Sequence, residues 1–356
     1  MGLLVPYTIA EGVTSIARGT RAGTSLLATA YSRWFGKREP TDPSVEMITD
    51  VGQITALLPL LRANAVGLGN SPFPQLATDA AAINRTEDGC LVQKPNLRKT
   101  MSYLRSNLFN PFDQMTYFYD TDRPLPPEIT RFFARYGFRQ VQLTTNEYGE
   151  RSTLPSVRAV DKVLVAGDSV ANGVMLSDDE TIASALQRRD LVRQYINLGI
   201  ARAQAADIVC ALEKAAQRYP HEIRELIYVF CENDFSDTEP YGRPDDLVRW
   251  VSDFAQRTHL DRVVVLYVPY IYNTVPEITR IAGHSHHDFP TYREPKQRLL
   301  QAAEQAGFTV IDFLDIANAQ RRAVGSQFAP LALYVDHTHL SKLGVELLLP
   351  RLAMGH

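Results

Sequence analysis

The second half of this chain alternates short apolar runs with helical patterns, and this alternation restricts the folds open to it. Runs rich in Val, Ile, Leu and Tyr are typical of strands buried on both faces of a sheet, and they occur at 162–166, 194–198, 225–231, 262–268 and 309–313. Helical patterns follow them at 179–189, 203–219, 244–258, 293–306 and 341–352. The alternation predicts a parallel sheet covered by helices on both faces.

Local signals mark two of the helix ends. Ser177, Asp178 and Glu180 offer N-cap oxygens and first-turn acids to the helix expected at 179–189. Gly307 is a natural residue to end the helix expected at 293–306.

The first 155 residues are less regular. We expect an N-terminal extension of mixed helix and strand at 1–155 and one α/β domain at 156–356. Within the extension the patterns predict, in order, a helix, loops with short elements, two strands and a turn, at 43–62, 63–115, 114–119, 140–145 and 146–149.

The composition argues against a nucleic-acid-binding protein and against a transmembrane helix in this chain. The chain has 356 residues and a formal net charge of −3, so it lacks the basic character of a nucleic-acid-binding protein. It contains no apolar run of about 18 residues, which a transmembrane helix requires. Scattered basic residues near the N-terminus are read as plain surface charge rather than a patch for an anionic surface: Arg18, Arg21, Arg33, Lys37 and Arg38.

No secretory signal is visible as the sequence is written, because a basic n-region and an apolar h-region are lacking at the N-terminus. A full-length chain would then be cytoplasmic, and a chain that has lost a signal or anchor would be extracytoplasmic. The sequence indicates no cofactor and leaves the oligomeric state open.

The cysteines suggest neither a disulfide framework nor a zinc ribbon. They are three in number, Cys90, Cys210 and Cys231, and none forms a CxxC pair. We expect Cys210 and Cys231 to be small buried hydrophobic residues.

Polar motifs stand at the ends of the expected strands. Ser169 follows the first strand within Gly-Asp-Ser, Gly199 ends Asn-Leu-Gly after the second, and Asn233 follows the third. Asp336 and His339 precede the last helix. Because functional groups gather at the carboxyl ends of parallel strands, these residues are expected to form one site.

The residue types suit acyl transfer through a serine. Ser169 would be the nucleophile, His339 its base and later the acid, and Asp336 the group that orients the histidine. The backbone N–H groups of Ser169 and Gly199 and the side-chain amide of Asn233 would form the oxyanion hole.

These four blocks resemble those of the SGNH hydrolases, also called the GDSL esterase/lipase family, over residues 161–353. Val170 stands where the family often has Leu, and Cys231 replaces the glycine of the third block. The resemblance implies a three-layer α/β/α sandwich with a flavodoxin-like sheet of five parallel strands. It also implies a shallow active site for a small-molecule or carbohydrate ester, with a short acyl group such as acetyl favoured.

The extension is similar to a layout found in anchored or exported bacterial members of that family. There a Lys-Pro-Asn element and an Asn-x-x-Gly-x-Arg element precede the serine block. Here they are Lys94-Pro95-Asn96 and the segment from Asn146 to Arg151.

Several alternatives stay open. The same site would also serve an O-acyltransferase, and a decayed site would leave a glycan-binding module. Tyr267, Tyr270 and Tyr272 suit either a substrate groove or the edge of the core. A cluster of three histidines and an acid is read as a solvated loop rather than a zinc site: His284, His286, His287 and Asp288.

Overall fold

The computed structural model describes the larger part of the chain. The described residues are 83–103, 119–120, 139–155, 157–236, 243–275, 292–325, 329–335 and 338–353. Four of the sequence predictions fall outside the described residues: the helix at 43–62, the basic residues at 18–38, the histidine cluster at 284–288 and Asp336.

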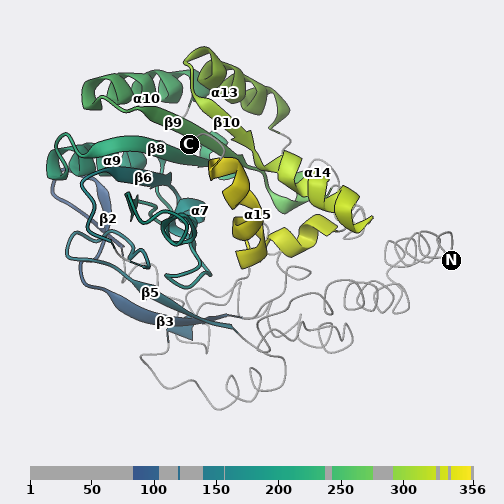
Figure 1. Ribbon diagram of the computed structural model, residues 1–356, viewed down its shortest axis with the longest axis horizontal. Helices are drawn as coiled ribbons and strands as arrows, with labels where there is room; N and C mark the ends of the chain where they lie inside the picture. Colours follow the sequence, from purple (N-terminus) through teal and green to yellow (C-terminus); the bar gives the residue numbers. More distant parts are fainter. Residues whose placement is uncertain are drawn as a thin grey trace.

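A parallel five-stranded sheet forms the centre of the molecule (Figure 1). Its strands are β6 (Lys162–Gly167), β7 (Gln194–Asn197), β8 (Ile223–Cys231), β9 (Arg262–Val268) and β10 (Thr309–Asp312). They lie in the order β10-β9-β8-β6-β7, and every neighbouring pair is parallel. This is the flavodoxin-like order, so the fold class and all five strands expected from the sequence are confirmed, with ends within about two residues.

Helices cover both faces of this sheet. Alternate residues of β6 point to opposite faces, so that Val163 and Val165 join one apolar core and Leu164 and Ala166 join the other. The first core is closed by α8 (Ile182–Gln187), α14 (Phe313–Val324) and α15 (Lys342–Ala353). The second is closed by α9 (Ala205–Arg218), α10 (Pro244–Thr258) and α13 (Arg293–Gln305). The three layers of the predicted sandwich are therefore present.

The N-terminal region supplies small antiparallel sheets. A hairpin pairs β1 (Ile83–Arg85) with β2 (Leu91–Gln93), and a second sheet has the order β4-β3-β5, with β4 (Tyr119–Asp120), β3 (Arg98–Tyr103) and β5 (Arg139–Thr144). The strand expected at 140–145 is confirmed as β5. The turn expected at 146–149 is confirmed by the hydrogen bond from the Gly149 N–H to the Asn146 carbonyl.

One helix begins later than predicted, and one helix was not predicted. α8 begins later than expected, with Thr181 as its N-cap, because the Asp178 carboxylate is taken up by the N-terminal region. No helix was expected directly after the strand at 309–313, but Asp312 ends β10 and caps α14 by accepting from the Leu314 N–H at 2.9 Å. The apolar residues of the first turn of α14 had looked like the continuation of the strand.

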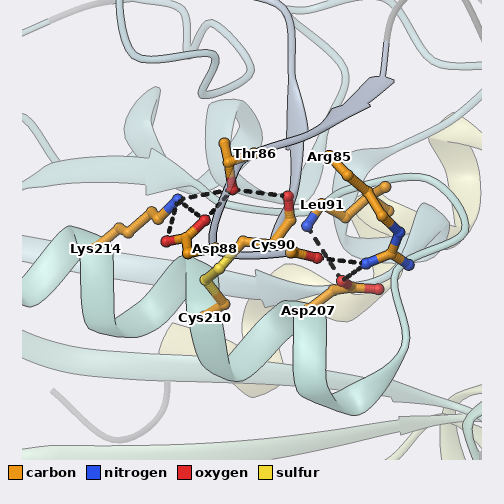
Figure 2. Close-up of a disulfide and its surroundings, with 9 residues drawn as sticks. Arg85, Thr86, Asp88, Cys90, Leu91, Asp207, Cys210 and Lys214 are labelled. Carbon is orange, nitrogen blue, oxygen red and sulfur yellow. Dashed lines mark hydrogen bonds and ion pairs between the residues drawn. A yellow bond between two sulfur atoms is a disulfide. The ribbon is translucent and has the colours of Figure 1, made fainter.

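The reading of Cys210 as an unbonded core residue was wrong. Cys210 lies half-buried on α9 and forms a disulfide with Cys90, which directly precedes β2 (Figure 2). Arg85 and the Leu91 N–H both contact the Asp207 carboxylate, at 3.0 and 3.1 Å, so the hairpin is attached to α9 at several points. Cys231 is free and buried, as expected.

Thiol alkylation will check this pairing. In protein that is unfolded without reductant, one cysteine, Cys231, should react with N-ethylmaleimide, and after reduction all three should react. Intact mass spectrometry measures the number of adducts. Three adducts without reduction would contradict the disulfide.

Candidate active site

The carboxyl ends of three adjacent strands bring three of the predicted site residues to one edge of the sheet. Ser169 begins α7 (Ser169–Asn172) directly after β6, and Gly199 follows β7. Asn233 lies in the short helix η1 (Glu232–Ser236) after β8. Because β6 pairs with β7 on one side and with β8 on the other, Ser169 sits between the other two segments.

The turn into α7 needs glycine at its first position. Gly167 has φ +153°, and a Cβ there would lie 2.4 Å from the Val229 carbonyl oxygen. No other residue fits between β6 and β8 at this point. The chain can therefore turn sharply and present the half-buried Ser169 at the edge of the sheet.

A buried carboxylate joins the serine block to the asparagine block. Asp168 is 1% exposed; its Oδ1 accepts from the Val170 N–H at 2.9 Å and its Oδ2 from Asn233 Nδ2 at 2.7 Å. Ser169 Oγ donates to the same Oδ2 at 3.3 Å. The sequence motif had marked Asp168 only as a neighbour of the serine, yet it holds the Asn233 amide beside Ser169.

Gly199 is held on both sides of its Cα. Its N–H donates to Asn197 Oδ1 at 3.0 Å, and its carbonyl accepts from Asn172 Nδ2 at 2.8 Å and from Gln93 Nε2 at 2.9 Å. A Cβ at this position would lie 2.0 Å from the Asn172 backbone nitrogen. Glycine is therefore required here by the close approach of α7.

The segment that carries His339 lies against the end of β8. Thr338 is buried, and its Oγ1 lies 3.1 Å from the Cys231 Sγ. The His339 carbonyl accepts from the Val335 N–H at 2.9 Å, so the chain folds back on itself here. His339 is thus held next to the segment of Asn233, whereas the position of its expected partner Asp336 stays a prediction.

Cys231 is a free cysteine that lies buried at the end of β8. Burial raises the pKa of the Cys231 thiol, and the carboxylates of Asp168 and Asp234 act in the same direction. A protonated, fully buried thiol is a poor nucleophile. Cys231 is therefore a poor candidate for a nucleophile.

The aromatic residues after β9 divide between the two expected roles. Tyr267 and Tyr272 are buried and belong to the core. Tyr270 is half-buried, and its ring lies 6.5 Å from the ring of Tyr292, which in turn lies 5.2 Å from that of Phe235. Phe235, Tyr270 and Tyr292 therefore form an aromatic cluster close to Asn233.

A buried glutamate holds this cluster to the end of β8. Glu232 Oε2 accepts from the Tyr270 N–H at 2.7 Å and from Asn273 Nδ2 at 2.6 Å, and Glu232 Oε1 accepts from the Tyr267 hydroxyl. Burial raises the pKa of Glu232, against the lowering effect of these hydrogen bonds. Its role was not visible in the sequence, where it was only the residue before Asn233.

The N-terminal region reaches the site through a buried arginine. The Arg151 side chain is fully buried, and its Nη1 donates to the carbonyls of Asn172 and Gly173 at 2.8 and 2.7 Å, at the C-terminal end of α7. Its Nε pairs with Asp178 Oδ1 at 3.1 Å. Burial lowers the pKa of Arg151, and the Asp178 charge opposes this shift.

Some solved structures resemble this chain at low sequence identity. A lipolytic G-D-S-L family protein from Veillonella parvula is 12% identical, with a TM-score of 0.40, over 55% of this chain and 97% of that one. An acetyl xylan esterase, AlAXEase, is 13% identical, with a TM-score of 0.41, over 55% and 98%. An acetylxylan esterase of Geobacillus stearothermophilus is 16% identical, with a TM-score of 0.38, over 56% and 95%. No family model matches the sequence, and no curated protein matches it.

The Arg151→Met substitution should destabilise the protein strongly. It removes one partner of the buried ion pair with Asp178 and the Arg151 donor of the Asn172 and Gly173 carbonyls, at a cost of roughly 3–5 kcal/mol. Urea denaturation measures this change. Arg257→Met is the matched control, because Arg257 is 54% exposed in its ion pair with Glu213, and such pairs contribute less than about 1 kcal/mol. Equal losses in the two variants would contradict the role given to Arg151.

Proposed function

We propose that this chain is a serine ester hydrolase of the SGNH type that removes a short acyl group through an acyl-enzyme on Ser169. The observation that carries the proposal is the Asp168 carboxylate, which binds Asn233 Nδ2 and Ser169 Oγ at one edge of the sheet. Gly199, the third oxyanion-hole residue expected from the motifs, is held against α7, the short helix that begins with Ser169.

In the proposed mechanism Ser169 Oγ attacks the ester carbonyl while His339 takes its proton. Asp336 would hold the histidine ring and stabilise the imidazolium. The developing oxyanion would accept from the Ser169 N–H, the Gly199 N–H and the Asn233 amide. His339 then protonates the leaving alcohol, and water, activated by the same histidine, releases the acid and regenerates Ser169.

The carbohydrate nature of the alcohol is supported by the aromatic cluster of Phe235, Tyr270 and Tyr292. Phe235 follows Asn233 by two residues, its ring lies 5.2 Å from that of Tyr292, and sugar rings pack well on aromatic faces. The preference for an acetyl group comes from the resemblance to SGNH hydrolases.

Among the residues that the structure describes, no helix has the length and apolar character needed to cross a membrane.

The disulfide supports a further proposal about compartment. Disulfides persist in oxidising environments and are rare in the reducing cytosol. We propose that this chain matures in an oxidising compartment, where Cys90 and Cys210 can pair. Alkylation of freshly lysed cells, with and without export of the chain, should show the oxidised form only in the exported protein.

An ester series tests the chemistry. The wild type should hydrolyse p-nitrophenyl acetate and butyrate faster than palmitate, and Ser169→Ala should lower kcat by roughly 10³-fold or more, because the nucleophile is lost. Ser252→Ala on α10 is a matched control and should keep full activity. The function proposed here fails if the wild type hydrolyses none of these esters and a fluorophosphonate probe does not label Ser169.

Product partitioning separates hydrolase from transferase. With p-nitrophenyl acetate and an added xylo-oligosaccharide, a hydrolase gives acetate as the main product, because water attacks the acyl-enzyme. Chromatography and mass spectrometry quantify acetate and acetylated sugar. Predominance of the acetylated sugar would instead identify an O-acyltransferase with the same serine site.

A further inference from the structure

The carbonyl of Gly199 receives a hydrogen bond from outside the α/β sandwich. Gln93 lies in β2 of the N-terminal hairpin, is 5% exposed, and donates from Nε2 to this carbonyl at 2.9 Å. The second donor, Asn172 Nδ2, belongs to the helix of the nucleophile. Residues 106 positions apart in the sequence thus meet at the glycine expected to supply an oxyanion donor.

Holding this carbonyl matters because glycine has no side chain to restrict its backbone. The N–H and the carbonyl of Gly199 belong to two peptide groups that meet at its Cα. Asn197 Oδ1 fixes the first group, and the amides of Asn172 and Gln93 fix the second. An oxyanion donor is effective only when its direction is set before the charge develops.

The position of Gln93 is itself fixed from both sides of its strand. The Cys90–Cys210 disulfide and the Leu91–Asp207 hydrogen bond attach the preceding residues to α9 (Figure 2). On the other side Gly149, with φ +82°, packs so closely that a Cβ would lie 2.2 Å from the Gln93 carbonyl oxygen. Because α9 begins at Ala205, shortly after Gly199, the hairpin contacts both Gly199 and the helix that follows it.

We propose that Gln93 is a positioning residue for the oxyanion donor at Gly199 and that the Cys90–Cys210 disulfide is its anchor. This inference rests on the proposed esterase function. It means that the N-terminal region acts on the chemical step without contacting the reacting atoms, and that reduction of the disulfide lowers activity through Gln93.

The first test is Gln93→Met in the full chain, which keeps the length of the side chain and removes the amide. Expected is a fall in kcat of about 10- to 100-fold on p-nitrophenyl acetate, with KM within about twofold and an equal fall in the rate at which a fluorophosphonate labels Ser169. Gln187→Met is the matched control: this fully buried glutamine also donates to backbone carbonyls, those of Asp190 and Arg193, but at the opposite end of β7. It should lower the melting temperature and leave kcat within about twofold of wild type.

If the wild type is active and labelled, and Gln93→Met has the same kcat and labelling rate, the positioning role is overturned. The esterase proposal then stays intact. Equal loss of kcat in Gln93→Met and Gln187→Met also overturns it, because the effect is then general destabilisation. Absence of both hydrolysis and labelling in the wild type overturns the proposed function and this inference together.

The second test is a double-mutant cycle between the disulfide and Gln93. The double variant Cys90→Ala/Cys210→Ala should lose no more kcat than Gln93→Met loses. The triple variant, which adds Gln93→Met, should have the same kcat as Gln93→Met alone. Dithiothreitol should lower the kcat of wild type but not of Gln93→Met. Multiplicative losses, or equal sensitivity of both proteins to dithiothreitol, overturn the anchoring role of the disulfide.

Discussion

The hydrogen bonds of the buried Arg151 guanidinium are the interactions on which the position of Ser169, the proposed nucleophile, depends. Desolvation of an arginine is costly, and here it is offset by the Asp178 carboxylate and by carbonyls at the end of α7. The Arg151 N–H also donates to the Asn197 carbonyl at 3.2 Å, at the end of β7. One residue thus fixes the C-terminal end of the helix that begins with Ser169 and the strand that leads to Gly199.

The other residues of the candidate site are held in place by hydrogen bonds between motif residues. Asp168 binds Asn233, Asn197 binds Gly199, and Asp234 Oδ2 accepts from the Cys231 N–H at 2.9 Å. Each of these bonds uses a polar side chain that lies within two residues of a proposed catalytic group in the sequence. These bonds fix the positions of the Gly199 and Asn233 segments before a substrate arrives.

The sandwich and the grouping of Ser169, Gly199 and Asn233 followed from the sequence, because apolar runs predict strands and parallel strands align their carboxyl ends. Elements whose ends depend on distant partners did not follow. α8 begins later than predicted because the Asp178 carboxylate binds Arg151. No sequence pattern near Cys90 indicates a disulfide partner 120 residues away. Gln93 gave no signal either, since a glutamine in a three-residue strand resembles any surface residue until its acceptor is known.

A boundary near residue 155 separates two sequence patterns, but hydrogen bonds to the site cross it. Within the described residues, the Gly199 carbonyl, the Asn172 carbonyl and the Asp178 carboxylate all take donors from 93–151. A sandwich without these segments would lose hydrogen bonds that its own residues replace only in part, since Asn172 still donates to Gly199 and Asn197 to Asn172. The N-terminal segments are therefore a structural part of the candidate active site, and the irregular pattern that made them hard to read reflects their contacts with a sheet far along the chain.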